Sequence, residues 1–103
     1  MVLDVYGITR EFPKIEDYCL TSQIRRAVIS IPSNIAEGFR RQGLADSKHF
    51  YNIAQGSLEE TKYQLLLAKD LNYINSDQYQ QIIFLAEEVS KLLNGWIKVQ
   101  KSN

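Results

Sequence analysis

A proline stands in the middle of the clearest amphipathic helix pattern in the sequence, at residues 20–43. At about 100° of rotation per residue, the apolar residues of this segment fall on one side of a helix. Pro32 has no N–H and its ring crowds the carbonyl four residues earlier, which in an exposed helix costs about 3 kcal/mol. We therefore predict a helix kinked at Ser30 to Ser33 and held together by packing. Its apolar side comprises Ile24, Ala27, Val28, Ile31, Ile35, Gly38 and Phe39.

The ends of this helix and a shorter one before it are predicted from local residue types. Thr21 or Ser22 is expected to cap the start, and Gly43 to stop the helix. Residues 2–11 form a short helix that ends before Pro13. Val2, Leu3, Tyr6 and Phe12 are expected to face the core from this segment, and Tyr18 and Leu20 to dock the connector that follows.

Two longer helices follow, at residues 45–72 and 76–99. Ser76 or Asn75 is expected to cap the last one, and Gly56 to allow close helix contact. The expected inward residues of the third helix are Phe50, Ile53, Ala54, Ser57, Thr61, Leu65, Ala68 and Leu71, and those of the fourth are Tyr79, Ile82, Leu85, Ala86, Val89, Leu93, Trp96 and Ile97.

Short loops between these helices favour antiparallel neighbours. We therefore predict an all-α, up-down-up-down four-helix bundle, with a short first helix and a proline-kinked second helix, that occupies residues 1–103 as a single domain. No apolar run approaches the roughly 20 residues that span a membrane, and the first residues do not resemble a signal peptide. With one cysteine no internal disulfide can form, which favours a reducing, cytoplasmic location. Cys19 itself is expected to be a small packed residue.

The residues needed for a catalytic or metal site are scarce. His49 is the only histidine and Cys19 the only cysteine, so one chain can supply neither a di-iron site nor a Cys/His zinc site. A symmetric oligomer would still gather one His49 from each subunit, but a partly exposed helix residue is the simpler interpretation. We predict no metal, no cofactor and no enzyme activity.

Basic residues are concentrated in the second helix, although the chain as a whole has a formal net charge of zero. Residues 23–43 carry four arginines and one acid, a net charge of +3: Arg25, Arg26, Arg40 and Arg41 against Glu37. Arg26 and Arg40 would share a face about 21 Å apart on an unkinked helix. Such a row can hold the phosphates of a nucleic acid. The alternative is a solvated face paired with Glu37, Asp46 or Glu59.

Two further groups of residues in and beyond this helix have open interpretations. Asn34 and Glu37 either bind a partner, or satisfy backbone groups freed by Pro32 or tie the helix to a neighbour. Gln23 can form similar bridging contacts at the start of the helix. Several apolar residues lie off the inward stripes and suggest a subunit interface: Ile29, Tyr63, Leu66, Ile83 and Phe84.

The strings Leu20 to Ala27 (LTSQIRRA), Ser30 to Glu37 with Gly38 (SIPSNIAEG) and Gly56 to Thr61 (GSLEET) carry a family resemblance. The chain resembles the bacterial 23S rRNA intervening-sequence protein family, also called the four-helix bundle protein family. Members usually have a longer first helix that carries a tryptophan, whereas only Val2 to Glu11 is available here. The family also looks like the accessory variability determinant proteins of diversity-generating retroelements. Those relatives are basic pentamers that bind nucleic acid and a reverse transcriptase, and their strong positive charge is missing here.

Together these observations predict a cytoplasmic, non-enzymatic homo-oligomer that acts as a binding or scaffold protein, and the resemblance implies a pentamer. Structured RNA, or another nucleic acid, is the leading partner class, with the four arginines as contacts. The alternative is a protein-interaction adaptor with no nucleic-acid role. An enzyme would instead hold a metal or a small molecule after purification.

Overall fold

The four predicted helices are present in a computed structural model that describes the backbone of residues 1–102 and the side chains of residues 1–99. The helices are α1 (Val2–Thr9), α2 (Leu20–Arg40), α3 (Leu44–Asp70) and α4 (Ser76–Ser102), with a 3₁₀ turn at Lys14–Glu16 before α2. The described residues form no strand. The all-α prediction is therefore confirmed.

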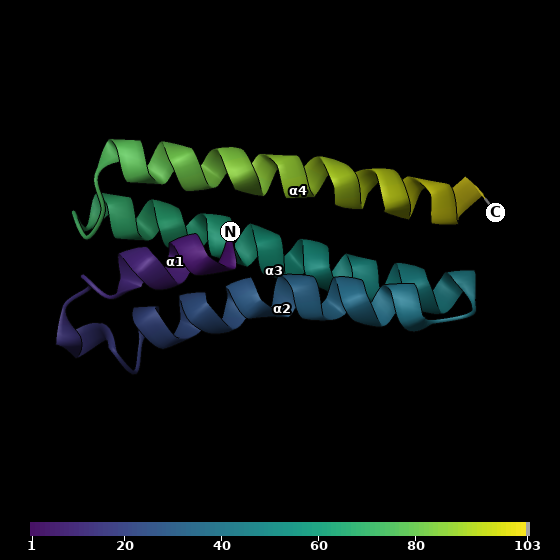
Figure 1. Ribbon diagram of the computed structural model, residues 1–103, viewed down its shortest axis with the longest axis horizontal. Helices are drawn as coiled ribbons and strands as arrows, with labels where there is room; N and C mark the ends of the chain where they lie inside the picture. The colour runs from purple at the N-terminus through teal and green to yellow at the C-terminus, as the bar shows by residue number, and fades with distance from the viewer. Residues whose placement is uncertain (103) are drawn as a thin grey trace.

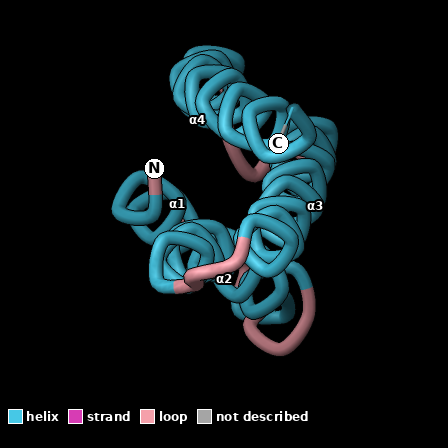
Figure 2. The backbone as a smooth tube through the Cα atoms, turned by 90° about the vertical axis from the view of Figure 1, so that its right-hand side faces the viewer, coloured by secondary structure: helices cyan, strands magenta, loops and turns pink. Residues whose placement is uncertain are grey.

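The helices lie along one long axis in a molecule of 46 × 24 × 17 Å. In Figure 1 the chain reverses direction between successive helices. The end-on view in Figure 2 places α2 between α1 and α3, with α4 on the other side of α3. The most extensive contact joins α2 to α3, followed by that of α3 with α4. α1 has eight residues and α2 has 21, so α1 covers only part of its neighbour.

The predicted apolar side of α2 is confirmed over most of its length. Ile24 and Val28 are fully buried, and Ile31 is 4% exposed. Phe39 departs from the prediction because its side chain is 62% exposed. It lies near the end of α2 that α1 does not cover, where its ring contacts the rings of Tyr51 and Trp96 at centroid distances of 5.8 and 5.2 Å.

The buried surface of α3 differs from the predicted stripe. Ala54, Thr61, Leu65 and Ala68 are buried as expected, but Ile53 and Leu71 are exposed and Phe50 is only partly buried. Tyr51 and Leu58, which the pattern did not include, are buried instead. α3 packs against α2 on one side and α4 on the other, so its buried surface is wider than a single stripe.

Two glycines illustrate the difference between an expected and an observed close contact. A Cβ at Gly38 would overlap the ring of Tyr51, so the ring can lie against α2 only because Gly38 has no side chain. A Cβ at Gly56 would meet nothing within 4 Å. The expectation of a close helix contact at Gly56 was therefore wrong.

The N-terminal segment packs partly as predicted: Phe12 is buried and Val2 packs against the core, but Leu3 is exposed and Val5 is buried in addition. Val5 is fully buried and Phe12 is 6% exposed, whereas Leu3 is 85% exposed. In the connector Leu20 is buried as expected, but Tyr18 is 95% exposed. Cys19 is exposed as well, so the prediction of a packed cysteine was wrong.

The start and end of α2 also differ from the prediction. α2 begins after Cys19 without a side-chain capping hydrogen bond, and Thr21 is buried. The helix ends at Arg40, and Gly43 instead precedes the first residue of α3. In α4, Ile82, Ala86 and Leu93 are buried as predicted, while Leu85 is 36% exposed.

The turn between α3 and α4 follows its local sequence closely. Asn72 adopts a left-handed φ of 63°, and the N–H of Tyr73 donates to the carbonyl of Ala68 at 2.9 Å. This is the pattern in which asparagine replaces glycine after a helix. Asn75 then caps α4 as predicted, because its Oδ1 accepts from the N–H of Gln78 while the Gln78 side chain accepts from the N–H of Asn75.

Candidate functional site

Three of the four predicted arginines lie in α2, and Arg41 directly follows it. Arg25 and Arg41 contact other side chains within the described part of the chain, whereas Arg26 and Arg40 do not. Arg25 is half-buried, donates from Nε to the Thr9 hydroxyl at 2.8 Å and lies over the Tyr6 ring at 4.7 Å. It therefore fastens α1 to α2. Arg41 pairs with Glu37 at 3.2 Å and lies over the Phe50 ring at 4.7 Å.

Arg26 and Arg40 are exposed, and within residues 1–99 neither makes a hydrogen bond, ion pair or ring contact to another side chain. Both belong to α2 and lie 14 residues apart, a rise of about 21 Å in a straight helix. Among the described residues, no side chain uses the donors of these two guanidinium groups.

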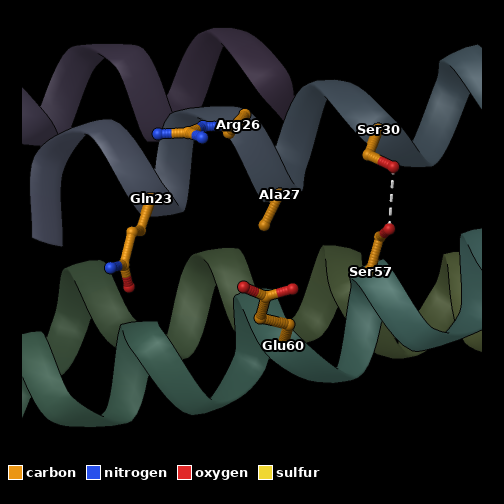
Figure 3. A pocket seen from close by; sticks show the side chains of 6 residues that line it. All are labelled: Gln23, Arg26, Ala27, Ser30, Ser57 and Glu60. Atoms are coloured by element: carbon orange, nitrogen blue, oxygen red, sulfur yellow. Dashed lines mark hydrogen bonds between the residues drawn. The ribbon is translucent and has the colours of Figure 1, made fainter.

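One of them borders the polar groove, a hollow of about 300 Å³ between α2 and α3. Figure 3 shows Gln23 and Glu60 pointing into the space between the two helices, and Arg26 lying along the α2 wall on the side of Gln23. The groove is lined by Gln23, Arg26, Ala27, Ser30, Ser57 and Glu60. Its walls supply a cation, a carboxylate, an amide and two hydroxyls.

One end of the polar groove is closed by a hydrogen-bond network centred on Ser30. The Ser57 hydroxyl donates to Ser30 Oγ at 2.8 Å, and Asn34 Nδ2 donates to the same oxygen at 2.9 Å. Both lone pairs of the Ser30 hydroxyl are thus used, so its own O–H is the group left to interact with a ligand.

The Glu60 carboxylate in the polar groove accepts a hydrogen bond from a buried glutamine one turn further along α3. Gln64, which is 4% exposed, donates from Nε2 to Glu60 Oε1 at 3.2 Å. Within the described side chains Glu60 Oε2 has no hydrogen-bond or ion-pair partner. Arg26 and Glu60 both line the groove without forming an ion pair: the Glu60 carboxylate points into the space between the helices, and the Arg26 side chain lies along α2 (Figure 3).

The polar residues around Pro32 have local roles. Pro32 lies inside the continuous helix α2, and the kink stays a prediction. Asn34 donates to the Ser30 carbonyl at 2.8 Å, and Ser33 donates to that of Ile29 at 2.9 Å. These carbonyls follow that of Val28, which loses its partner to the proline. Gly38 accepts at its carbonyl from the Ser47 hydroxyl at 2.9 Å.

A second hollow, the apolar hollow, lies on the α1 side of α2 and measures about 220 Å³. It is lined by Met1, Val2, Val28, Ile31, Pro32, Ile35 and Val89. These side chains supply no donor or acceptor, so this hollow reflects packing between α1, α2 and α4.

The apolar residues predicted at a subunit interface are mostly exposed. Tyr63 and Phe84 are each 65% exposed, Ile29 is 42% and Leu66 is 39%. Ile83 differs, because it is partly buried and packs against the core.

Among the described residues no group of three His, Cys, Asp or Glu side chains is placed to hold a metal ion. His49 is exposed and its ring contacts Phe50 at a centroid distance of 5.3 Å. In the same part of the chain no helix combines the length and apolarity needed to cross a membrane.

Lys62 and Tyr73 have shifted pKa values, and both lie in contacts between helices or turns outside the polar groove. Burial alone would lower the pKa of Lys62, but its bonds to Glu87 of α4 at 3.0 Å and to Glu59 at 3.2 Å outweigh burial and raise it. The pKa of Tyr73 is raised because its hydroxyl donates to the Glu16 carboxylate at 2.8 Å. Both groups fasten the bundle.

Sequence reasoning identified Gln23 and Arg26 but missed Ser30, Ser57 and Glu60 as parts of one site. Ser57 and Glu60 are three residues apart on α3, and Arg26 and Ser30 are four apart on α2, so each pair shares a helix face. That spacing was the available signal. It could not show which residues of α2 and α3 face each other.

An all-α chain of long packed helices with a polar groove between two of them is a helical-bundle protein. The model of the 23S rRNA-intervening sequence protein family matches residues 1–95, and the chain belongs to that family. The resemblance stated from the sequence is therefore confirmed. A search of curated proteins found no match.

The fold is also similar to a crystal structure from Bacteroides thetaiotaomicron VPI-5482, described as a protein with unknown function from the S23 ribosomal protein family. The two sequences are 31% identical, and the TM-score is 0.86. The match covers 94% of this chain and 91% of that one.

Proposed function

We propose that this protein is a cytoplasmic, non-enzymatic homo-oligomer that binds structured RNA through the outer face of α2. The observation that carries the proposal is the pair Arg26 and Arg40, which are exposed and keep their donors free on one helix. Guanidinium groups bind phosphate oxygens with fixed two-point geometry. The family description, which refers to an intervening sequence in 23S rRNA, supports an RNA context.

Oligomerisation is the second part of the proposal. Tyr63 and Phe84 are each 65% exposed, and covering such residues in a subunit contact would remove apolar area from water. Repetition around a ring, a pentamer by the family resemblance, would also multiply the charge of α2. Light scattering then gives a mass that is a multiple of the chain mass, whereas a monomer contradicts this part.

The RNA experiment measures anisotropy of a labelled hairpin RNA at 50 and 200 mM salt. The double variant Arg26→Glu, Arg40→Glu should bind at least about tenfold more weakly and with a shallower salt dependence, because fewer counterions are released. The control is Arg10→Glu, Lys14→Glu, which makes the same change of charge in the connector before α2. Equal affinity of the two double variants would contradict the proposal.

A protein-interaction adaptor is the second candidate, favoured by the same exposed apolar side chains. In that case the oligomer ignores RNA at every salt concentration and holds a protein partner salt-tolerantly. Substitution of Phe84 and Tyr63 by serine would then abolish capture, while Arg26→Glu, Arg40→Glu would leave it intact.

A further inference from the structure

We propose that the polar groove between α2 and α3 takes one unpaired guanine base of the bound RNA. This inference rests on the proposed function and adds a base-specific contact to it. The hollow measures about 300 Å³, at the lower limit of ligand pockets in general. A pocket of this size suits a single base, and bases that proteins read in RNA are commonly unpaired and turned outward.

The Glu60 carboxylate selects the base. An ionised carboxylate only accepts hydrogen bonds, and guanine is the base whose Watson–Crick edge offers two adjacent donors, N1–H and the N2 amine. Adenine, cytosine and uracil each place an acceptor beside their donor, which the carboxylate would repel. Glu60 enters the groove already oriented, because Gln64 donates to Oε1 at 3.2 Å and leaves Oε2 open.

The remaining atom of that edge, O6, needs a donor. Ser30 accepts from both Ser57 and Asn34, so its own O–H is available to a ligand. Ser57 and Glu60 lie three residues apart on α3, where Cβ atoms are about 5–6 Å apart. Ser30 on α2 is joined by its bond to Ser57 on α3, so its donor lies about one helical turn along the groove from Glu60 and faces the groove from the opposite wall.

The other walls complete the contact. Ala27 is 6% exposed and gives the base an apolar surface. In Figure 3 Arg26 lies along the α2 wall beside Gln23. In the proposed complex its guanidinium contacts the phosphate of the same nucleotide. This arrangement explains why Arg26 and Glu60 both line the groove without pairing with each other.

The test uses three hairpin RNAs that differ at one unpaired loop position, which is guanine, inosine or adenine. Inosine keeps N1–H and O6 but lacks the N2 amine. The wild-type protein should bind the guanine hairpin about tenfold more tightly than the other two, as expected for a two-point base contact. Glu60→Gln should lose this preference, because an amide cannot accept both donors. The control Glu88→Gln removes one charge on α4 and should keep it.

Circular dichroism and thermal unfolding of Glu60→Gln check that the fold is intact. If the three hairpins bind equally, or if Glu60→Gln retains the preference for guanine, the base contact is wrong while RNA binding through α2 stands. If the wild-type protein binds none of the hairpins, both the base contact and the proposed function are overturned.

Discussion

The two hollows that border α2 differ in what their walls can do. The polar groove faces α3, has a volume of about 300 Å³ and presents charged and hydrogen-bonding groups. The apolar hollow faces α1 and α4, has a volume of about 220 Å³ and is lined by aliphatic side chains and Pro32. A single helix thus borders one space that is suited to a polar ligand and another that concerns packing alone.

This difference shows that the volume of a hollow does not by itself identify a ligand-binding site. In the apolar hollow, empty space forfeits dispersion contacts and offers nothing that recognises a ligand. In the polar groove, Ser57 and Asn34 hold Ser30, and Gln64 holds Glu60, so the groups that face solvent are already oriented. Substitutions on the apolar side should therefore change stability, and those on the polar side should change binding.

The largest effect is expected on the apolar side. Ile31 is 4% exposed and lines the apolar hollow, so Ile31→Ala should lower the free energy of unfolding by about 2–5 kcal/mol. Urea denaturation measures this change. A loss below 1 kcal/mol would mean that the apolar side collapses readily around the deletion and does not hold the bundle together.

A smaller effect is expected from Ser30→Ala, which removes an acceptor from Ser57 and Asn34. Asn34 keeps its bond to the Ser30 carbonyl, so the loss should be about 1 kcal/mol. The matched control is Ser33→Ala on the same helix, which removes one exposed bond to Ile29 and should change stability less. Equal effects would show that the network at the polar groove is no better ordered than the surface.

Filling the apolar hollow should stabilise the protein modestly. Val89→Ile adds one methylene at its wall and should raise the free energy of unfolding by about 0.5 kcal/mol. Val99→Ile makes the same chemical change at a position that is 57% exposed on the same helix, and separates filling from helix propensity. If Val99→Ile stabilises the protein and Val89→Ile does not, the apolar hollow has no room for the added methylene.

The smallest effect on stability is expected from Glu60→Gln. Because Glu60 is exposed, the free energy of unfolding of the variant should stay within about 0.5 kcal/mol of that of the wild type. Chemical denaturation with Glu88→Gln alongside provides the measurement. A loss of stability well above about 0.5 kcal/mol would show that Glu60 supports the fold through its hydrogen bond with Gln64. The two hollows would then not differ in the way described.

Local chemistry was predictable from the sequence where neighbours along the chain decide the outcome. The apolar side of α2 from Ile24 to Ile31 and the Asn75 cap are such cases, because helix periodicity and capping act within a few residues. The burial of Phe39 and Cys19 depends on where α1 and the connector end, which a local sequence pattern does not predict. Both were predicted to be packed and are exposed.

The polar groove was only partly predictable, because it depends on the alignment of two helices. Ser30 meets Ser57 because α2 and α3 pack with Gly38 against Tyr51, a contact that sets which residues are opposite one another. The pattern placed Phe50 rather than Tyr51 on the inward stripe, so it missed part of the wider surface that α3 buries. Gln23 and Arg26 were recognised as polar residues of interest, but their partners on α3 were not.

The most direct test of the contrast is a map of amide chemical-shift changes on addition of the guanine hairpin RNA. If RNA binds at the polar groove, the changes should cluster on α2 and α3 around Arg26, Ser30, Ser57 and Glu60, with little change around Val2 and Val89. Changes centred on the apolar hollow, or confined to α4, would contradict it.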